Sequence, residues 1–254
     1  MFIDNFSLIN ETILVTGASS GIGRQVAIDC SNSGANLILL GRREKELKNT
    51  LDALSKGKHI SFICDVTNFG EIESIISKSV DSIGRISGFV HSAGIESTYP
   101  INIMKPEYYD KFFSTNVISA FEIIKIISKK KYLAKKGASM VLIASIMGIL
   151  GQPGKTAYCA SKGALISGSK ALALELASKN IRVNCILPSI VLTEMTNELF
   201  KSLPEDSVKE IIKMHPLGLG QPEDVSNACL FLLSNASRWI TGTDLIVDGG
   251  YSAQ

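Results

Sequence analysis

Tyr158 and Lys162 are the residues of this 254-residue sequence whose types and spacing most directly allow chemistry. They are four residues apart in a helical pattern, which places both side chains on one helix face, within reach of a single ligand. A free phenol has a pKa of about 10, whereas a neighbouring ammonium stabilises the phenolate and lowers that pKa. The pair therefore predicts a proton donor, Tyr158, tuned by Lys162. A tyrosine and a lysine on an ordinary exposed helix surface have the same spacing. Other residues must therefore decide whether this pair is catalytic.

The glycine-rich stretch "TGASSGIGR", residues 16–24, is a second candidate for function. A glycine-rich turn from a strand into a helix gathers unpaired N–H groups at the positive end of the helix dipole, which suits a pyrophosphate. Gly17, Gly21 and Gly23 follow the spacing G-x-x-x-G-x-G, which differs from the common dinucleotide fingerprint G-x-G-x-x-G. Two interpretations stay open from the motif alone, a dinucleotide loop and a tight turn without a ligand.

Alternating elements must position these residues. Seven apolar runs predict strands: "TILVT" (12–16), "NLILLG" (36–41), "HISFIC" (59–64), "SGFVHS" (87–92), "SMVLIAS" (139–145), "IRVNCIL" (181–187) and "DLIVD" (244–248). Most are apolar on both faces, as in a parallel sheet covered by helices on both sides. Helices are predicted at about 21–34, 43–56, 68–83, 106–131, 157–179, 204–213 and 222–235. Pro106 and Pro222 suit first helical turns. We predict a doubly wound α/β fold forming a single domain, 1–254.

Composition argues against several classes of function. The net charge of +2 is small and evenly spread, so no nucleic-acid partner is expected, and the basic run 129–137 fits a solvated helix end. No run of 18 apolar residues and no signal peptide is present, so no membrane partner is expected. Five scattered cysteines without a CxxC pair predict reduced thiols in a cytoplasmic protein. His59, His91 and His215 lack metal-ligand spacing, and we predict structural roles and no metal.

The chain resembles the short-chain dehydrogenase/reductase family over essentially its whole length. The resemblance is carried by "TGASSGIG" at 16–23, "CDV" at 64–66, "HSAG" at 91–94, "TNV" at 115–117, "IAS" at 143–145, "YCASK" at 158–162, "PSIVLTEM" at 188–195, "PEDV" at 222–225 and "ITGTDLIVDGG" at 240–250. It implies a Rossmann-type sheet, commonly in a homotetramer, that binds NAD or NADP. Ser92 stands where asparagine is usual and Ser189 where glycine is usual, which puts loop geometry in question more than activity.

The resemblance also implies roles for four polar residues. Ser145 would hydrogen-bond the substrate carbonyl, Tyr158 would give its proton, Lys162 would also hold the nicotinamide ribose, and Asn116 would anchor a proton-relay water. Hydride would pass between the nicotinamide and a carbonyl or secondary alcohol. The residues implied to bind the cofactor are Gly17, Ser19, Ser20, Gly21, Ile22, Gly23, Asp65, Val66, Ala93, Gly94, Tyr158, Lys162, Pro188, Val191 and Thr193.

Cofactor choice depends on the residues at the end of the second predicted strand and just beyond it. An enzyme that prefers NAD usually has a carboxylate there, about 20 residues beyond the glycines, to bind the ribose hydroxyls. Here that place is Gly41, and the guanidinium groups of Arg42 and Arg43 suit a 2′-phosphate. We predict NADP(H), with NAD(H) as the alternative. Two other arrangements stay open. In one, the arginines only pair with Glu44 or Glu46 on an exposed helix. In the other, a slip of register brings Glu44 to the ribose.

Residues 189–215 are predicted to form a lid over a small carbonyl or alcohol substrate. Its apolar residues fit substrate contact and packing equally well: Leu192, Met195, Leu199, Phe200, Ile211 and Met214. Broad similarity to 3-oxoacyl-[acyl-carrier-protein] reductases makes a 3-oxoacyl thioester one candidate substrate. The alternatives are a sugar or polyketide ketoreductase of the same family and an NAD(P)-binding regulator without turnover. Apolar surface on the helix carrying Tyr158 and on the run 240–250 indicates contact with other copies, and the resemblance to the family implies that these contacts form a homotetramer.

Overall fold

The computed structural model describes residues 3–253, apart from the side chains at positions 3, 4, 195 and 202. Its strands form one all-parallel sheet in the order β3-β2-β1-β4-β5-β6-β7. They are β1 (Thr12–Thr16), β2 (Asn36–Gly41), β3 (His59–Ile63), β4 (Gly88–His91), β5 (Ala138–Ile143), β6 (Ile181–Pro188) and β7 (Asp244–Val247). Each strand matches the run that predicted it to within two residues at either end, so the doubly wound Rossmann-type fold is confirmed.

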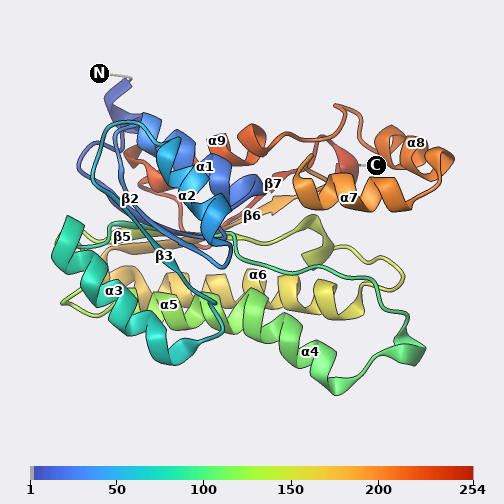
Figure 1. The fold of residues 1–254 in the computed structure, drawn as a ribbon, viewed down its shortest axis with the longest axis horizontal. Coiled ribbons are helices and arrows are strands. Elements are labelled where there is room, and N and C mark those ends of the chain that lie inside the picture. Colours follow the sequence, from blue (N-terminus) through green and yellow to red (C-terminus); the bar gives the residue numbers. More distant parts are fainter. Residues whose placement is uncertain (1–2, 254) are drawn as a thin grey trace.

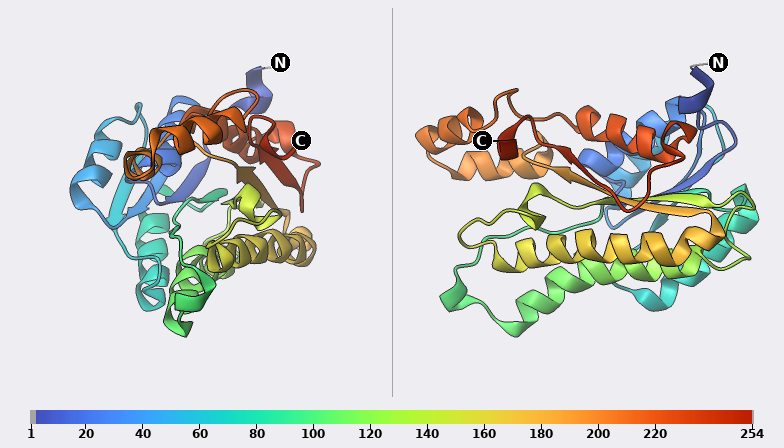
Figure 2. Two further views of the ribbon diagram at one scale, coloured as in Figure 1. Left: turned by 90° about the vertical axis from the view of Figure 1, so that its right-hand side faces the viewer. Right: turned by 180° about the vertical axis from the view of Figure 1, so that it is seen from behind.

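Helices cover both faces of the sheet (Figures 1 and 2). On one face lie α1 (Gly21–Asn32), α2 (Glu44–Asp52) and α9 (Pro222–Leu233), and on the other α3 (Phe69–Ile83), α4 (Pro106–Phe113), α5 (Ser119–Ile127) and α6 (Thr156–Leu176). The helices α7 (Glu194–Ser202) and α8 (Glu205–Lys213), within the segment predicted as a lid, extend past the carboxyl ends of the strands (Figure 2). Pro106 and Pro222 begin α4 and α9, as predicted.

The core occupies both sides of the sheet. In β1 all five residues are buried, and Leu14 packs with side chains of α3, α5 and α6. Its neighbours Ile13 and Val15 point to the opposite face and pack with side chains of α1 and α9. Alternate strand residues therefore enter two different cores, which explains why the strand runs are apolar on both faces. The cysteines are free thiols, four of them buried, as the sequence predicts: Cys30, Cys64, Cys159, Cys185 and Cys229.

Two helix predictions were wrong. The predicted helix 106–131 ends at Ile127 and is interrupted by a π-helical turn, Ser114–Ile118. The helix α7 was not predicted, because its sequence "EMTNELFKS" is short and has few apolar residues. It is instead started by Thr193, whose hydroxyl accepts a hydrogen bond from Thr196 N at 3.4 Å.

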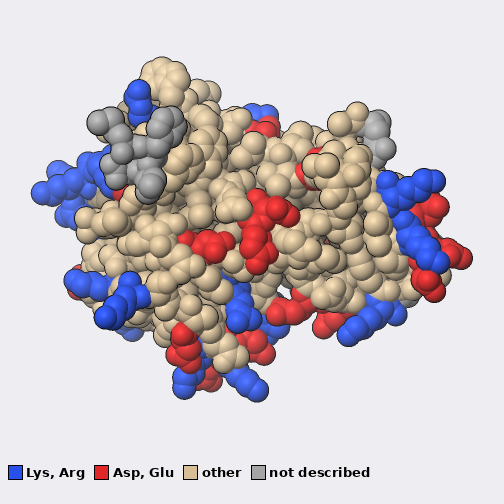
Figure 3. All heavy atoms as spheres, turned by 90° about the horizontal axis from the view of Figure 1, so that it is seen from above, with Lys and Arg blue, Asp and Glu red and all other residues tan. Residues whose placement is uncertain are grey.

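Charges of both signs are distributed over the surface. The basic run 129–137 follows the end of α5, and Lys129 and Lys131 bind Glu73 of α3 with N–O distances of 2.6 and 3.1 Å. On the face drawn in Figure 3, Lys and Arg lie mainly toward the edges and are interspersed with Asp and Glu. The basic run therefore ties the end of one helix to its neighbour.

Candidate active site

Most residues predicted to bind a cofactor line one cavity of about 460 Å³, here named the dinucleotide groove. These are Gly17, Ser19, Ser20, Gly21, Ile22, Arg42, Arg43, Asp65, Val66, Ala93, Gly94 and Thr193. The groove lies at the carboxyl ends of β1 to β4, where the strand order reverses on either side of β1. Such a switch point is where open α/β sheets bind ligands. Gly23, Tyr158, Lys162, Pro188 and Val191 lie outside this lining.

The glycines of the first turn are required by the protein's own backbone. A Cβ on Gly17, whose φ is +67°, would lie 2.8 Å from the Ala93 nitrogen and the Ser92 carbonyl. One on Gly23 would lie 2.4 Å from the Gly17 oxygen. The turn is thereby pressed against the loop after β4, and Ser20 makes no side-chain cap on α1. The first N–H groups of the helix are left for an anion, so the groove fits a dinucleotide pyrophosphate.

The two predicted 2′-phosphate residues stand at the rim of the groove. Arg42 pairs with Asp65 at 3.7 Å and Arg43 with Glu194 of α7 at 3.9 Å, rather than with Glu44 or Glu46. Burial alone would raise the pKa of Asp65, but hydrogen bonds from Thr67 and the charge of Arg42 lower it, so this carboxylate is ionised.

A side chain has little space at the end of β2. A Cβ on Gly41 would lie 3.2 Å from Leu47 Cδ1 and 3.3 Å from Ser19 Cβ. A ribose-binding carboxylate at this position would therefore need its neighbours to move. The groove also contains two acidic residues that the sequence did not indicate, Glu194 and Glu198, because the helix that carries them was not predicted.

Three of the predicted catalytic residues meet where β5 approaches α6. Ser145 follows β5, and its hydroxyl accepts a hydrogen bond from Met147 N at 3.1 Å and lies close enough to Tyr158 to influence the pKa of the phenol. Lys162 Nζ lies 5.8 Å from the centroid of the Tyr158 ring and donates to the Ile143 carbonyl at 2.8 Å. The spacing on α6 thus brings phenol and ammonium together, as predicted.

Asn116 joins this group through the π-helical turn. Its Oδ1 accepts from Ile95 N at 2.8 Å, and its Nδ2 donates to Ile95 O at 3.1 Å and Ser161 Oγ at 3.0 Å. Ser161 in turn donates to the Tyr158 carbonyl at 2.8 Å. The side chain is fully buried and its polar atoms are engaged, so it clamps the loop after β4 to α6.

Burial sets the charges of the site. It raises the pKa of Tyr158, while the hydrogen bond to Ser145 acts in the opposite direction. This differs from the predicted lowering by Lys162, whose ammonium points to the Ile143 carbonyl. Burial also lowers the pKa of Lys162 to about 8, because few groups compensate for the lost hydration. The protein alone therefore holds a neutral phenol beside a cation that loses its proton readily.

The histidines serve the fold. His91 is buried between Thr16 Oγ1, 3.0 Å from its Nδ1, and Ser119 Oγ, 3.4 Å from its Nε2. His59 Nδ1 accepts from Leu37 N at 3.2 Å. Among the described residues, His, Cys, Asp and Glu form no group of three that could hold a metal.

The two departures from the family pattern have structural roles. Ser189 Oγ lies 2.8 Å from His215 Nε2, and His215 Nδ1 lies 2.7 Å from the Ile211 carbonyl. A carbonyl only accepts, so Nδ1 carries the proton and Nε2 accepts from Ser189. The hydroxyl at position 189 therefore ties the segment after α8 to the end of β6. Ser92 lies where Gly17 and Gly23 pack closely against the loop after β4.

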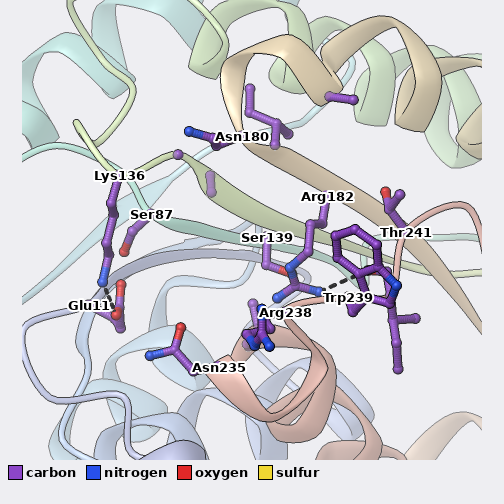
Figure 4. A pocket seen from close by; sticks show the side chains of 16 residues that line it. Glu11, Ser87, Lys136, Ser139, Asn180, Arg182, Asn235, Arg238, Trp239 and Thr241 are labelled. Atoms are coloured by element: carbon purple, nitrogen blue, oxygen red, sulfur yellow. Dashed lines mark hydrogen bonds and ion pairs between the residues drawn. The ribbon is translucent and has the colours of Figure 1, made fainter.

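A second cavity, of about 450 Å³, opens at the amino ends of the strands (Figure 4). Lys136 on its wall pairs with Glu11. Arg182 donates to the carbonyls of Leu232, Ile240 and Ser234 at 2.7, 3.2 and 3.2 Å. Its lining includes none of the predicted catalytic residues, and Lys136 and Arg182 hold loops and strands in place.

Comparison with known proteins agrees with this geometry. A family model described as enoyl-(acyl carrier protein) reductase matches residues 17–252. A 3-oxoacyl-[acyl-carrier-protein] reductase of Chlamydia muridarum is 38% identical over 97% of this chain and 99% of its own. An NAD-dependent glycerol dehydrogenase of Listeria innocua is 32% identical over 99% and 97%. A 7α-hydroxysteroid dehydrogenase solved with NADH superposes with a TM-score of 0.91 at 28% identity over 97% and 96%.

The fold, the groove and these similarities define a class of protein. The chain belongs to the short-chain dehydrogenase/reductase family, whose members are oxidoreductases that use nicotinamide cofactors. No helix within residues 3–253 is long and apolar enough to cross a membrane.

Proposed function

We propose that this protein is an NADP(H)-dependent oxidoreductase that interconverts a ketone and a secondary alcohol. The observation that carries the proposal is the grouping of Ser145, Tyr158 and the Lys162 ammonium, which lies 5.8 Å from the centroid of the phenol ring, next to a groove that fits a dinucleotide. A regulator that only bound the cofactor would have no need of a buried ammonium near a phenol.

The three side chains divide the work of proton transfer. A substrate carbonyl placed between Ser145 and Tyr158 would accept a hydrogen bond from each hydroxyl, which polarises it. Bound nicotinamide supplies or accepts the hydride. As negative charge develops on the substrate oxygen, Tyr158 gives up its proton, and the Lys162 ammonium stabilises the phenolate. Oxidation of an alcohol runs through the same groups in reverse.

Arg42 and Arg43 support the choice of NADP(H). Both guanidinium groups are exposed at the groove rim, and among the described residues each has one carboxylate contact, longer than 3.5 Å. A 2′-phosphate offers three acceptor oxygens and would compete well for them. NAD(H) stays the alternative, because Asp65, Glu194 and Glu198 add negative charge to the same groove. Two of the relatives are named or solved with NAD or NADH.

The experiment is an activity panel with purified protein. Simple ketones, a 3-oxoacyl thioester and keto sugars are each offered with NADPH and with NADH, and the loss of absorbance at 340 nm is followed. Turnover of at least one ketone, faster with NADPH, is expected. Absence of turnover across the panel, with the dinucleotide still bound, would favour the regulator.

A further inference from the structure

An ion pair lies beside the proposed catalytic tyrosine and takes no part in the chemistry above. Lys155 precedes the first residue of α6, three positions before Tyr158, and its ammonium contacts Glu96 Oε1. Glu96 follows Ile95, the residue that Asn116 clamps with two hydrogen bonds. Each charge is therefore close in sequence to the catalytic group, Lys155 through Tyr158 and Glu96 through Ile95, which Asn116 binds.

Neighbouring contacts fix the pair in place. The two loops that carry it run together, because Tyr99 N donates to the Gly154 carbonyl at 2.8 Å. A Cβ on Gly154 would lie 2.7 Å from Thr98 Cγ2, so the loops are in close contact. The Tyr99 ring stacks on Tyr108 of α4 with centroids 4.6 Å apart. The pair is therefore carried by two packed loops rather than by two mobile surface chains.

The pair is costly for the fold, which points to another reason for its presence. The Lys155 side chain is 10% exposed and that of Glu96 is 24% exposed, so both charges lose most of their hydration. A cation at the amino end of a helix also opposes the helix dipole. Residues that break local rules in this way concentrate at functional sites.

We propose that the Glu96–Lys155 pair determines substrate specificity and selects a ketone that carries a hydroxyl group. The proposal rests on the proposed function and names its substrate class. A hydroxyl donates to the carboxylate and accepts from the ammonium, so it replaces water at both charges. An alkyl group would remove that water and return no hydrogen bond. An anionic group would gain Lys155 but face the carboxylate of Glu96.

Two ketones of nearly equal shape test the proposal. Hydroxyacetone and 2-butanone differ only in whether a hydroxyl or a methyl ends the chain, and pyruvate supplies an anion. We expect kcat/KM with NADPH to be about 10- to 100-fold higher for hydroxyacetone, as for a hydrogen bond to a charged group. Glu96→Gln and Lys155→Gln should each remove most of that ratio while changing the value for 2-butanone less than about threefold. Glu107→Gln, an exposed acid on α4, is the matched control.

The outcomes separate this inference from the proposed function. Equal use of hydroxyacetone and 2-butanone by the wild type, or a ratio unchanged in both variants, overturns the specificity assignment while leaving the ketoreductase intact. A preference for pyruvate that Lys155→Gln alone removes would overturn it as well, and would assign an anion site. If no ketone is reduced, the proposed function itself is wrong.

Discussion

Single residues of the site carry charges that are set mainly by burial. The Lys162 ammonium is held almost out of water by its bond to the Ile143 carbonyl, and the neighbouring phenol is kept neutral. Both states match the start of ketone reduction, in which a phenol must give its proton to a developing alkoxide. Stabilisation of the phenolate then depends on a cation that cannot be screened by solvent.

Substituting Tyr158 tests the proton donor. Tyr158→Phe removes only the hydroxyl, so we expect kcat/KM to fall by several orders of magnitude while the Kd for the dinucleotide, measured by titration calorimetry, changes only a few-fold. Lys162→Ala should lower both turnover and cofactor affinity, because one ammonium serves the phenol and the ribose. Purely kinetic losses of equal size in the two variants would contradict that double role.

Arg42 tests the preference for NADP(H). If its guanidinium binds the 2′-phosphate, Arg42→Ala should weaken NADPH by about 1.5 to 3 kcal/mol, as expected for a hydrogen bond to a charged group. NADH binding should stay nearly unchanged. Lys48→Ala, an exposed cation on α2, gives the control for a general loss of positive charge. Equal weakening of both cofactors in Arg42→Ala would show that the ribose is recognised elsewhere.

Whether a contact in the site could be predicted depended on how far apart its residues lie in the sequence. Tyr158 and Lys162 could be found because they lie one turn apart on a single helix, and Ser145 through the family resemblance of "IAS" at the end of a predicted strand. The pairing of Glu96 with Lys155 could not, since it joins two loops that only the tertiary structure brings together. The same holds for the two acidic residues of α7 in the dinucleotide groove.

Elements hold the site through irregular backbone as much as through regular helices. The π-helical turn Ser114–Ile118 places Asn116 against the loop after β4, within a segment that the sequence predicts as one continuous helix. Strands were predicted well because burial on both faces leaves a continuous apolar run. The π turn was missed because it leaves the apolar period on either side almost unchanged.

His91 makes the stability of β4 depend on pH. Burial, followed by the charge of Lys162, lowers its pKa to about 3, against 6.5 in an unfolded chain. Below pH 6.5 the unfolded chain therefore binds a proton that the folded protein excludes, so stability is full above that pH and falls as the solution is acidified.

We expect the lowered pKa of His91 to reduce the free energy of unfolding by about 1.4 kcal/mol per pH unit on acidification, or about 2 kcal/mol from pH 6.5 to pH 5. Urea unfolding of the wild type and of His91→Gln at several pH values measures it. The variant is expected to be less stable at pH 7 but to lose less stability on acidification. Parallel pH profiles for the two proteins would show that His91 is not the group responsible.

At the scale of the whole molecule, apolar surface gathers along one side of the sheet. β7 is an edge strand with Ile246 44% exposed, and on the adjoining α6 the side chain of Leu174 is 81% exposed. The two elements are joined, since Lys170 binds Asp244 at 2.6 Å and a Cβ on Gly242 would touch Ala173 Cβ at 3.5 Å. An unpaired edge beside exposed leucine favours pairing with another copy.

We therefore expect a homotetramer in which α6 and β7 meet their counterparts across a two-fold axis. Leu174→Glu places a charge in that interface and should halve the mass measured by light scattering at micromolar concentration, whereas Lys48→Glu should leave the mass unchanged. Trp239, the one tryptophan of the sequence and 92% exposed, precedes β7 in the chain and gives a fluorescence signal close in sequence to that strand. Its emission should shift to the red and become more open to acrylamide quenching when Leu174→Glu separates the subunits. A wild-type monomer with fully accessible Trp239 would show instead that this surface stays open to solvent.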